Sequence, residues 1–437
     1  MSELTLEVAT LVALSSPALL LAAISLASLA PRPLPERWVA GATGSAMVMS
    51  MLALAIALAT CVATGGEARS FTARTWFSSH EGAFRFDLLV DTGALAFALL
   101  AATICGVVAR FSFRYLHREP GFHRYFVLFS AFALGMQMVA LAGSIEVLFA
   151  GWELVGLSSA LLVAFFHERP VPVTNGLRVF AYYRLSDAAM LIAAALLHVY
   201  AGDGSLHWVF GAGDVPPGLS QTQTTLICVF LIVAVAGKSA LLPLSSWLPR
   251  AMEGPTSSSA VYYGSLSVHA GCYLLWRATP LLEQSPVAQG LAIALGAATA
   301  LFATLVARVQ TDVKSALAFA SLTQVGLIVL EIALGLRTLA FVHMAGHASL
   351  RLLQFLTAPS VLHDLHALQA ERPASSPRPA EGGLRLRLYR FALERGHLDE
   401  MLDRLVVAPF RRAATTLDRF DRALAGETTT RPEAPRR

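Results

Sequence analysis

The chain has 437 residues, of which 55% are hydrophobic and 14% charged, with a mean hydropathy of +0.59 and a formal net charge of +4. Apolar runs of about 20 residues recur along it, which predicts a polytopic helical membrane protein. The alternation typical of an outer-membrane barrel is absent, and the runs are too long for core helices of a soluble protein. The arginine-rich loops and tail explain the positive charge, so nucleic-acid binding is not predicted.

The first predicted region, residues 1–85, holds two transmembrane helices and an external loop. The helices are expected at 4–30 and 39–64. No basic residue precedes the first helix and its apolar run is too long for a signal peptide, so we expect it to be retained. No segment of the chain is predicted to form a β-strand, and the expected fold class is therefore all-α.

The second predicted region, residues 86–360, holds the remaining membrane helices and forms the main membrane domain. We place them at 89–110, 125–143, 145–166, 179–201, 224–249 with a break, 256–278, 287–308, 314–335 and 338–358. The whole chain is therefore predicted to cross the membrane eleven times.

The remaining residues differ in composition from the membrane domain. Residues 361–383 are rich in proline, serine and glycine and are predicted to be a flexible linker. Residues 384–425 place apolar side chains at helical spacing among many charges, which predicts cytoplasmic amphipathic helices on the lipid bilayer or on a partner. Residues 426–437 are predicted to be disordered.

The charges of the short loops predict the orientation of the chain. The loop from Arg110 to Arg124 is basic, whereas the loop that contains Asp203 and Asp214 has no basic residue. Because basic loops stay in the cytoplasm, the N-terminus is predicted outside and the C-terminus inside. The expected location is a bacterial-type cytoplasmic (inner) membrane.

Only two of the 33 basic residues are lysines, Lys238 and Lys314. Lys238 lies inside an otherwise uncharged apolar stretch, where a charge is costly and indicates a function. A guanidinium keeps its proton in a protein, whereas a lysine ammonium in a desolvated site can release it. A lysine at this position therefore indicates proton transfer.

Further polar residues cluster on a few predicted helices. They are Glu153 on the fifth helix, Arg184 and Asp187 three residues apart on the sixth, and His343, His347 and Arg351 at four-residue intervals on the eleventh. Each spacing puts the side chains of one helix on one face. Buried carboxylate, ammonium and imidazole groups tolerate the membrane when they neighbour one another and internal water, so we interpret the cluster as a proton wire.

Prolines break the predicted seventh helix close to its lysine. Pro243 follows Lys238 by five residues and removes an intrahelical hydrogen bond. Unpaired backbone in a membrane occurs only where protein buries it or where it lines a watered cavity. Transporters place ion sites at such breaks, which supports the same interpretation.

Simpler interpretations remain open for the same residues. Glu153 and Lys238 could form a purely structural ion pair, and the spacing of His343 and His347 would also suit two metal ligands. Lys314 could merely anchor its helix at the membrane surface. The four cysteines share no spacing with zinc or iron–sulfur sites, and no nucleotide fingerprint follows a strand, so we expect no metal and no cofactor.

Four segments resemble, in order and spacing, the antiporter-like proton-conducting subunits of respiratory complex I. They are GWELVGLSSALL, AGKSALLPLSSWLPRAMEGPTSSSA, ARVQTDVKSALAFASLTQVG and FVHMAGHASLRLLQFL, and the L-type (chain 5) subunit is the most similar type. The resemblance implies a proton relay of Glu153, Lys238, His343 and His347. It also implies supporting charges at Asp187, which lies beside Arg184, and at Asp312 and Lys314.

Three departures limit what the resemblance implies. Where the family has a histidine on the eighth helix this chain has Tyr263, and His269 follows six residues later, so either could serve the middle of the relay. Arg351 stands where the family has a lysine, and it can hold charge but not relay a proton. A second broken helix, which L-type members carry, is not found before the linker.

Two functions of different class are compatible with these features. In the first, the chain is a proton-translocating subunit of a complex I-like assembly whose redox subunits drive it. In the second, it is the membrane subunit of a DAB-type inorganic-carbon transporter with a cytoplasmic zinc partner akin to carbonic anhydrase. H⁺ is the expected ion, with Na⁺ as an alternative. A scaffold that retains the fold without conducting is a third hypothesis.

Overall fold

The structure is a computed structural model of the full chain. It describes residues 2–31, 33–79, 82–202, 204–212, 219–310, 313–358 and 383–425, and of residues 76–79, 82–84 and 385 it describes the backbone only. Several predictions fall outside these ranges: the acidic loop residues Asp203 and Asp214, the supporting charge Asp312, most of the linker and the last twelve residues of the chain.

Long helices make up most of the described chain. They are α1 (Ser2–Ser28), α2 (Glu36–Ala63), α3 (Thr92–Tyr115), α4 (Phe122–Leu141), α5 (Ile145–Val163), α6 (Pro170–Ala201), α7 (Gln221–Lys238), α12 (Pro286–Ala307), α13 (Val313–Ala333) and α14 (Arg337–Thr357). Among the described residues, nine helices are long and apolar enough to cross a membrane, and α14, which carries the predicted histidines, is not one of these nine. The prediction of a polytopic helical membrane protein is confirmed, whereas the predicted number of eleven crossings stays a prediction.

A β-hairpin in the loop predicted to be external contradicts the expectation that the chain has no strand. Strands β1 (Arg69–Ser79) and β2 (Gly82–Val90) pair antiparallel, with Arg69 opposite Val90. The sequence carried a signal for β2, because apolar residues alternate at Phe84, Phe86, Leu88 and Val90. The membrane helix predicted at 89–110 accordingly starts later, at Thr92 in α3.

The chain after α7 is a series of short helical pieces. They are η1 (Leu244–Ser246), α8 (Trp247–Arg250), η2 (Ala251–Glu253), α9 (Thr256–Ser258), the π-helical η3 (Ser259–Ser265), α10 (Ser267–Arg277) and α11 (Thr279–Leu282). Helix α7 ends at Lys238, and Ser239 is its C-cap. The next residue, Ala240, adopts a left-handed conformation with φ 55°. The Leu241 amide donates to the Ala236 carbonyl, as in a Schellman cap.

Protein groups satisfy the backbone that this break exposes. The amide of Leu242 donates to Thr299 Oγ1 on α12, 3.0 Å away, and the indole of Trp247 donates to the Gly237 carbonyl, also over 3.0 Å. Irregular backbone within a membrane protein needs such internal partners. The segment that follows Lys238 is therefore held inside the protein.

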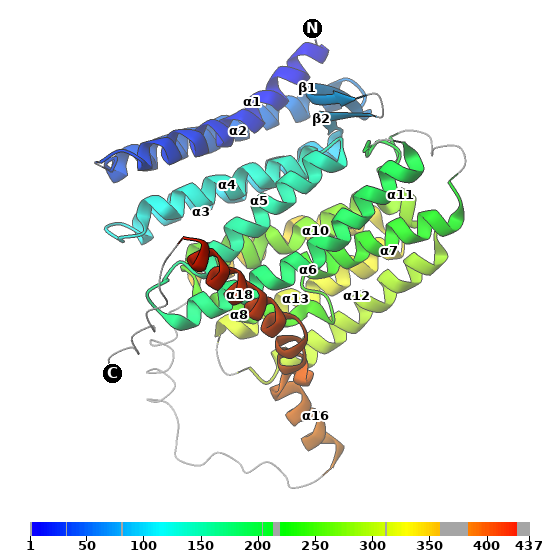
Figure 1. The fold of residues 1–437 in the computed structure, drawn as a ribbon. Helices are drawn as coiled ribbons and strands as arrows, with labels where there is room; N and C mark the ends of the chain where they lie inside the picture. The colour runs from blue at the N-terminus through cyan, green and yellow to red at the C-terminus, as the bar shows by residue number, and fades with distance from the viewer. Residues whose placement is uncertain are drawn as a thin grey trace.

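The helix bundle has two recognisable ends, which we call the hairpin side and the tail side (Figure 1). Arg277 at the end of α10 bonds Asp91, the residue between β2 and α3, so this end of α10 lies on the hairpin side. Arg178 of α6 bonds Asp403, and Arg250 of α8 bonds Asp399. Both acidic residues belong to the C-terminal region, and these contacts define the tail side.

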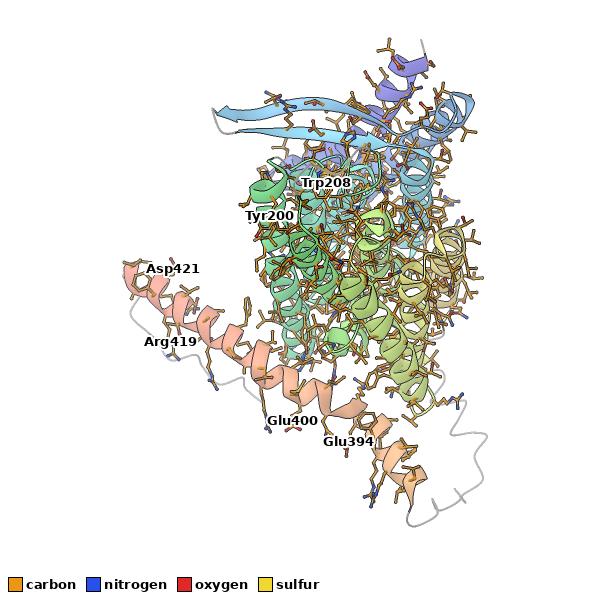
Figure 2. The ribbon with its side chains drawn as sticks, turned by 90° about the vertical axis from the view of Figure 1, so that its right-hand side faces the viewer. Tyr200, Trp208, Glu394, Glu400, Arg419 and Asp421 are labelled. Carbon is orange, nitrogen blue, oxygen red and sulfur yellow. The ribbon has the colours of Figure 1, made fainter. Side chains whose placement is uncertain are left out.

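The C-terminal region is helical and lies across the tail side. Its elements are α16 (Leu384–Leu393), η4 (Arg395–His397), α17 (Leu398–Leu402), η5 (Asp403–Val407) and α18 (Ala408–Leu424). Figure 2 shows that the end of α18 marked by Arg419 and Asp421 extends sideways away from the bundle, while Glu394 lies at the end opposite the hairpin. The prediction of one or two amphipathic helices at 384–425 thus corresponds to helices in the structure.

Candidate functional site

Helices α5 and α6 are joined by a network of charged side chains. The Arg184 guanidinium donates to Glu153 Oε2 of α5 and, over 2.6 Å, to Asp187 Oδ2 of its own helix. The other Asp187 oxygen accepts from the indole of Trp152 at 2.8 Å. Asp187 is buried, so these bonds supply the solvation that its carboxylate loses. The predicted pair of Arg184 and Asp187 therefore also links two helices.

Lys238 is fully buried at the last turn of α7. Its ammonium donates to the Trp152 carbonyl at 3.0 Å and lies over two aromatic faces, 4.8 Å from the Trp152 ring centre and 4.4 Å from that of Tyr183. Carbonyl and ring faces both attract a cation. Trp152 contacts both Lys238 and Asp187 and so connects the lysine to the charged network.

Two glycines allow the lysine to approach this closely. A Cβ added at Gly156 of α5 would lie 3.0 Å from Lys238 Nζ, and a Cβ added at Gly237 would overlap Ser186 of α6. Small residues at these positions bring α5, α6 and α7 together around one ammonium, as small residues commonly do in membrane bundles.

The structure does not join Glu153 directly to Lys238. Within the described residues no carboxylate oxygen lies within 4.0 Å of the Lys238 ammonium, and Glu153 bonds Arg184 instead. The guanidinium can reach both carboxylates of the network from α6, whereas the lysine side chain ends between two aromatic rings. The ion pair of Glu153 and Lys238 considered above is therefore not formed in the structure. Glu153 is paired with Arg184 instead.

Hydroxyl groups lie between the lysine and the histidines. The Tyr183 hydroxyl is 3.5 Å from Ser267 Oγ, and Ser267 precedes His269 by two residues at the start of α10. Ser265 Oγ and His269 Nδ1 are buried without a hydrogen-bond partner among the described residues. Buried polar atoms in proteins are nearly always bonded to protein or to water, so these atoms are suited to internal water.

The second half of the candidate site is a pair of histidines on α10 and α14. His269 Nε2 and His347 Nδ1 are 2.9 Å apart, and the Arg351 Nε donates to His347 Nε2 at 3.1 Å. All three side chains are buried. Of the two candidates for the middle of the relay, His269 is therefore the one that contacts a predicted relay histidine.

His343 is bonded to different groups from His347, although the two lie one turn apart on α14. Its Nδ1 is 2.9 Å from Glu331 Oε1 and its Nε2 is 2.9 Å from Gln324 Oε1, both on α13. The ring centres of His343 and His347 are 6.3 Å apart. Since the two rings turn to different helices, this geometry does not favour the metal-ligand interpretation.

The remaining predicted residues lie around this core. Tyr263, in the buried η3, donates its hydroxyl to the Ser159 carbonyl at 3.2 Å, and Pro243 precedes η1 in the break. Lys314 of α13 is 3.5 Å from Thr256 Oγ1. Lys314 thus contacts the first residue of α9 and not the residues that surround Lys238.

Sequence reasoning missed five residues of the site: Trp152, Tyr183, Ser267, Gln324 and Glu331. Glu331 had a signal, because it is an acidic residue within the apolar run predicted at 314–335. The other four had none, since they carry no charge and only the packing shows what they contact.

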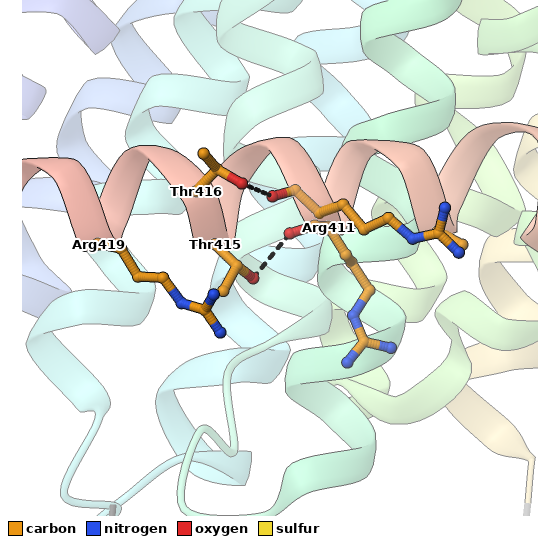
Figure 3. Close-up of a pocket in the computed structure, with 6 residues that line it drawn as sticks. Arg411, Thr415, Thr416 and Arg419 are labelled. Carbon is orange, nitrogen blue, oxygen red and sulfur yellow. Dashed lines mark hydrogen bonds between the residues drawn. The ribbon is translucent and has the colours of Figure 1, made fainter. Parts of the chain in front are cut away.

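A basic surface on α18 is separate from this site. Arg411, Arg412 and Arg419 line an exposed groove together with Thr415 and Thr416, as Figure 3 shows. The two threonine hydroxyls donate to the backbone carbonyls one turn earlier, each over 2.8 Å. This groove lies on the side of one exposed helix, and it contacts none of the buried titratable groups described above.

Models of two protein families match the chain. The family described as NADH:quinone oxidoreductase/Mrp antiporter, TM, matches residues 142–374. The family described as NADH-Ubiquinone oxidoreductase (complex I), chain 5 N-terminus, matches residues 76–126. The first match contains every predicted relay residue, and the second contains the end of the hairpin and α3.

Curated relatives agree with these matches. NADH-ubiquinone oxidoreductase chain 5 of Loxodonta africana is 33% identical over 291 residues, which are 67% of this chain and 47% of the relative. NADH-quinone oxidoreductase subunit L of Neisseria meningitidis is 32% identical over 303 residues, which are 67% of this chain and 45% of the relative. The chain thus spans about half the length of the curated relatives that it matches.

Two solved structures share the fold. A chain of the Mrp complex from Dietzia sp. DQ12-45-1b has 26% identity and a TM-score of 0.67, covering 80% of this chain and 37% of that chain. A chain of the membrane-bound sulfane sulfur reductase, an archaeal respiratory membrane complex, has 22% identity and the same TM-score, covering 79% and 70%. Both relatives come from multi-subunit membrane complexes, and the second supports the fold alone.

Proposed function

We propose a function from one premise: this chain belongs to the NADH:quinone oxidoreductase/Mrp antiporter transmembrane family, whose model matches more than half of it. On that premise the protein moves protons across a membrane as one subunit of a larger, complex I-like assembly. The proton-carrying groups are Glu153, Lys238, His343 and His347. The relatives named as subunits of NADH-quinone oxidoreductase support this function.

The environment of Lys238 is the observation that carries the proposal. Its ammonium is fully buried and bonds one carbonyl, with no carboxylate within 4.0 Å among the described residues. A side chain held there by one acceptor and two aromatic faces can exist as an ammonium or as a neutral amine. Arginine would stay charged, so the lysine provides what a relay requires.

The buried polar groups provide a route from the lysine to the histidines. Tyr183 and Ser267 connect the lysine side of the bundle to α10, and His269 then bonds His347. Water at the unpartnered Ser265 hydroxyl and His269 Nδ1 would complete the connection. In this route Arg184 and Asp187 are the supporting charges next to Glu153, and they bias the protonation of Lys238.

The partners and orientation follow from the same premise. We expect redox subunits of the assembly to drive the relay, and we expect the N-terminus outside and the C-terminal helices in the cytoplasm of a bacterial inner membrane. The relatives described above give no support to the alternative of an inorganic-carbon transporter with a zinc partner. H⁺ is the proposed ion because the side chains at the core of the site, a lysine and histidines, are of types that can bind and release a proton.

Substitution of Lys238 tests this function. The assembly that co-purifies with the tagged full chain is reconstituted in liposomes, supplied with NADH and a quinone, and assayed for proton uptake with a pH-sensitive dye. Lys238→Arg should assemble normally yet lose uptake by on the order of 100-fold, since the charge remains but the proton cannot be released. Replacing Na⁺ with choline should not change wild-type uptake. Full uptake by Lys238→Arg would contradict the proposal.

A further inference from the structure

A carboxylate and an imidazole form a hydrogen-bonded pair between α13 and α14. Both oxygens of Glu331 lie within hydrogen-bond distance of His343 Nδ1, at 2.9 and 3.0 Å. Both side chains are partly buried, with exposed fractions of 19% for Glu331 and 23% for His343. The pair is thus neither sealed in the core nor fully exposed, in contrast to His347, which is buried.

The pair lies near the hairpin side of the bundle. Helix α13 ends at Ala333, two residues after Glu331, and the carbonyl of Ala333 accepts from Gln289 near the start of α12. The connection that follows exposes Leu334 and Leu336, at 53% and 47%. Arg337, the first residue of α14, uses its carbonyl to bond the indole of Trp276, which precedes the hairpin-side Arg277. Glu331 therefore lies within one helical turn of that surface.

Gln324 provides the other nitrogen of His343 with a partner in either charge state. Its amide oxygen, 2.9 Å from His343 Nε2, accepts a hydrogen bond when the ring is an imidazolium. A rotation of the amide presents its NH₂ group, which donates to the same nitrogen when the ring is neutral. A histidine whose surroundings suit both states is well prepared to gain and lose a proton.

The pair also continues the relay of the buried histidines. His343 lies one turn from His347 on α14, with ring centres 6.3 Å apart, and His347 bonds His269. The exposure of the titratable groups therefore increases along the series, from the buried His269 and His347 to the partly exposed His343 and Glu331. The last member, Glu331, is an acid next to the surface.

We propose that Glu331 and His343 form the hairpin-side terminus of the proton relay, where protons are exchanged with water. This inference rests on the proposed function. A proton that reaches Nε2 of His343 makes the ring an imidazolium. Breaking its Nδ1–H bond and forming an O–H bond on Glu331 leaves a neutral ring and a neutral acid, and the acid then releases its proton to water and becomes a carboxylate again. The reverse sequence takes up a proton.

A purely structural pair that holds α13 against α14 would have the same geometry, and glutamine distinguishes the two roles. Glu331→Gln keeps an oxygen that accepts from His343 Nδ1, so a structural link survives, but the amide cannot carry the proton. Glu331→Asp keeps the acid on a side chain that is one methylene shorter. Glu283, an exposed acid beside the same connection near Gly335, supplies the matched control Glu283→Gln.

Proton uptake by the reconstituted assembly described above is measured for the wild type and for four variants: Glu331→Gln, Glu331→Asp, Glu283→Gln and Lys238→Arg. We expect Glu331→Gln to reduce proton uptake at least about tenfold. Its co-purification with the other subunits and its stability in detergent should stay at the wild-type level, and the Glu283→Gln control should keep wild-type uptake. Glu331→Asp should recover a measurable part of the uptake.

The outcomes separate this inference from the proposed function. Wild-type uptake in Glu331→Gln, together with loss in Lys238→Arg, would overturn the terminus and leave the function intact. Equal losses in Glu331→Gln and Glu331→Asp, accompanied by reduced detergent stability, would assign the pair a structural role and also overturn it. An absence of NADH-driven uptake in the wild-type assembly would instead contradict the proposed function itself.

Discussion

Arg351 determines which nitrogen of His347 carries the proton. The arginine donates from Nε to His347 Nε2 at 3.1 Å, and a guanidinium cannot accept, so His347 Nε2 must be the acceptor. The proton of a neutral His347 is then on Nδ1, which faces His269 Nε2 at 2.9 Å. The pair is thereby ordered, with His347 as the donor and His269 as the acceptor. Arg351, expected only to hold charge, also sets the tautomer.

We predict that Arg351→Leu reduces proton uptake at least about tenfold, because His347 is then free to adopt the other tautomer. Arg351→Lys keeps a charged donor on a flexible stem and should retain most of the uptake. ¹⁵N NMR of the histidine-labelled protein reports the tautomer directly. A Leu variant with an unchanged His347 tautomer and unchanged uptake would show that the arginine does not orient the ring.

The sequence predicted a polytopic helical membrane protein and most of the polar residues of the candidate site, because their signals are local. The cost of placing Glu153, Lys238 or His347 in an apolar run is visible without any knowledge of packing. The same reasoning applied to Glu331 would have found it. The β-hairpin was missed because long apolar helices dominated the composition, although residues 84–90 alternate.

The partners of these groups could not be predicted, because they depend on how helices rotate and approach one another. Periodicity placed Arg184 and Asp187 on one face but could not show that Arg184 would also bind Glu153. The aromatic faces of Trp152 and Tyr183 around Lys238 result from close packing at Gly156. Such contacts join residues that are far apart in sequence, and no local pattern specifies them.

Gly156→Ala tests whether the position of Lys238 matters for transport. The added methyl group would lie 3.0 Å from the ammonium, so the lysine must shift by a few tenths of an ångström within its site, where its ammonium bonds the Trp152 carbonyl at 3.0 Å. We expect proton uptake to fall about tenfold while the helix itself is not weakened, since alanine favours helix over glycine. Gly346→Ala, next to His347 but with no atom within 4 Å of the added carbon, should retain normal uptake. Similar uptake in both variants would contradict the prediction.

A close contact between two glycines should control the stability of the α12–α13 pair. A Cβ added at Gly326 would lie 2.6 Å from the Ala300 amide nitrogen, and one added at Gly296 would lie 2.8 Å from the Gly326 carbonyl. Because backbone blocks both sites, Gly326→Ala should destabilise the protein by about 1–3 kcal/mol. Thermal unfolding in detergent measures this. Gly290→Ala, on the same α12 but in open space, is the control and should not lower the midpoint.

Of the two ion pairs described on the tail side, the one between Arg178 and Asp403 should contribute more to the docking of the C-terminal helices. Arg178 of α6 donates from Nε to Asp403 Oδ1 at 2.8 Å and from a second nitrogen to the other oxygen, and the arginine is only 13% exposed. A two-bond contact of this kind is stronger than a single exposed ion pair. The pair therefore holds η5, and α18 beyond it, against the membrane domain.

We predict that Arg178→Gln destabilises this docking by about 1–2 kcal/mol, which corresponds to a roughly 5- to 30-fold faster trypsin cleavage within residues 383–425. Arg404→Gln is the matched control, since Arg404 bonds Glu400 within the tail and is 77% exposed. That substitution should change cleavage little beyond the loss of its own site. The reciprocal exchange, Arg178→Asp with Asp403→Arg, should restore protection. If Arg178→Gln were as protected as the wild type, the ion pair of Arg250 with Asp399 and the aromatic contact of Phe180 with Phe410 would hold the tail instead.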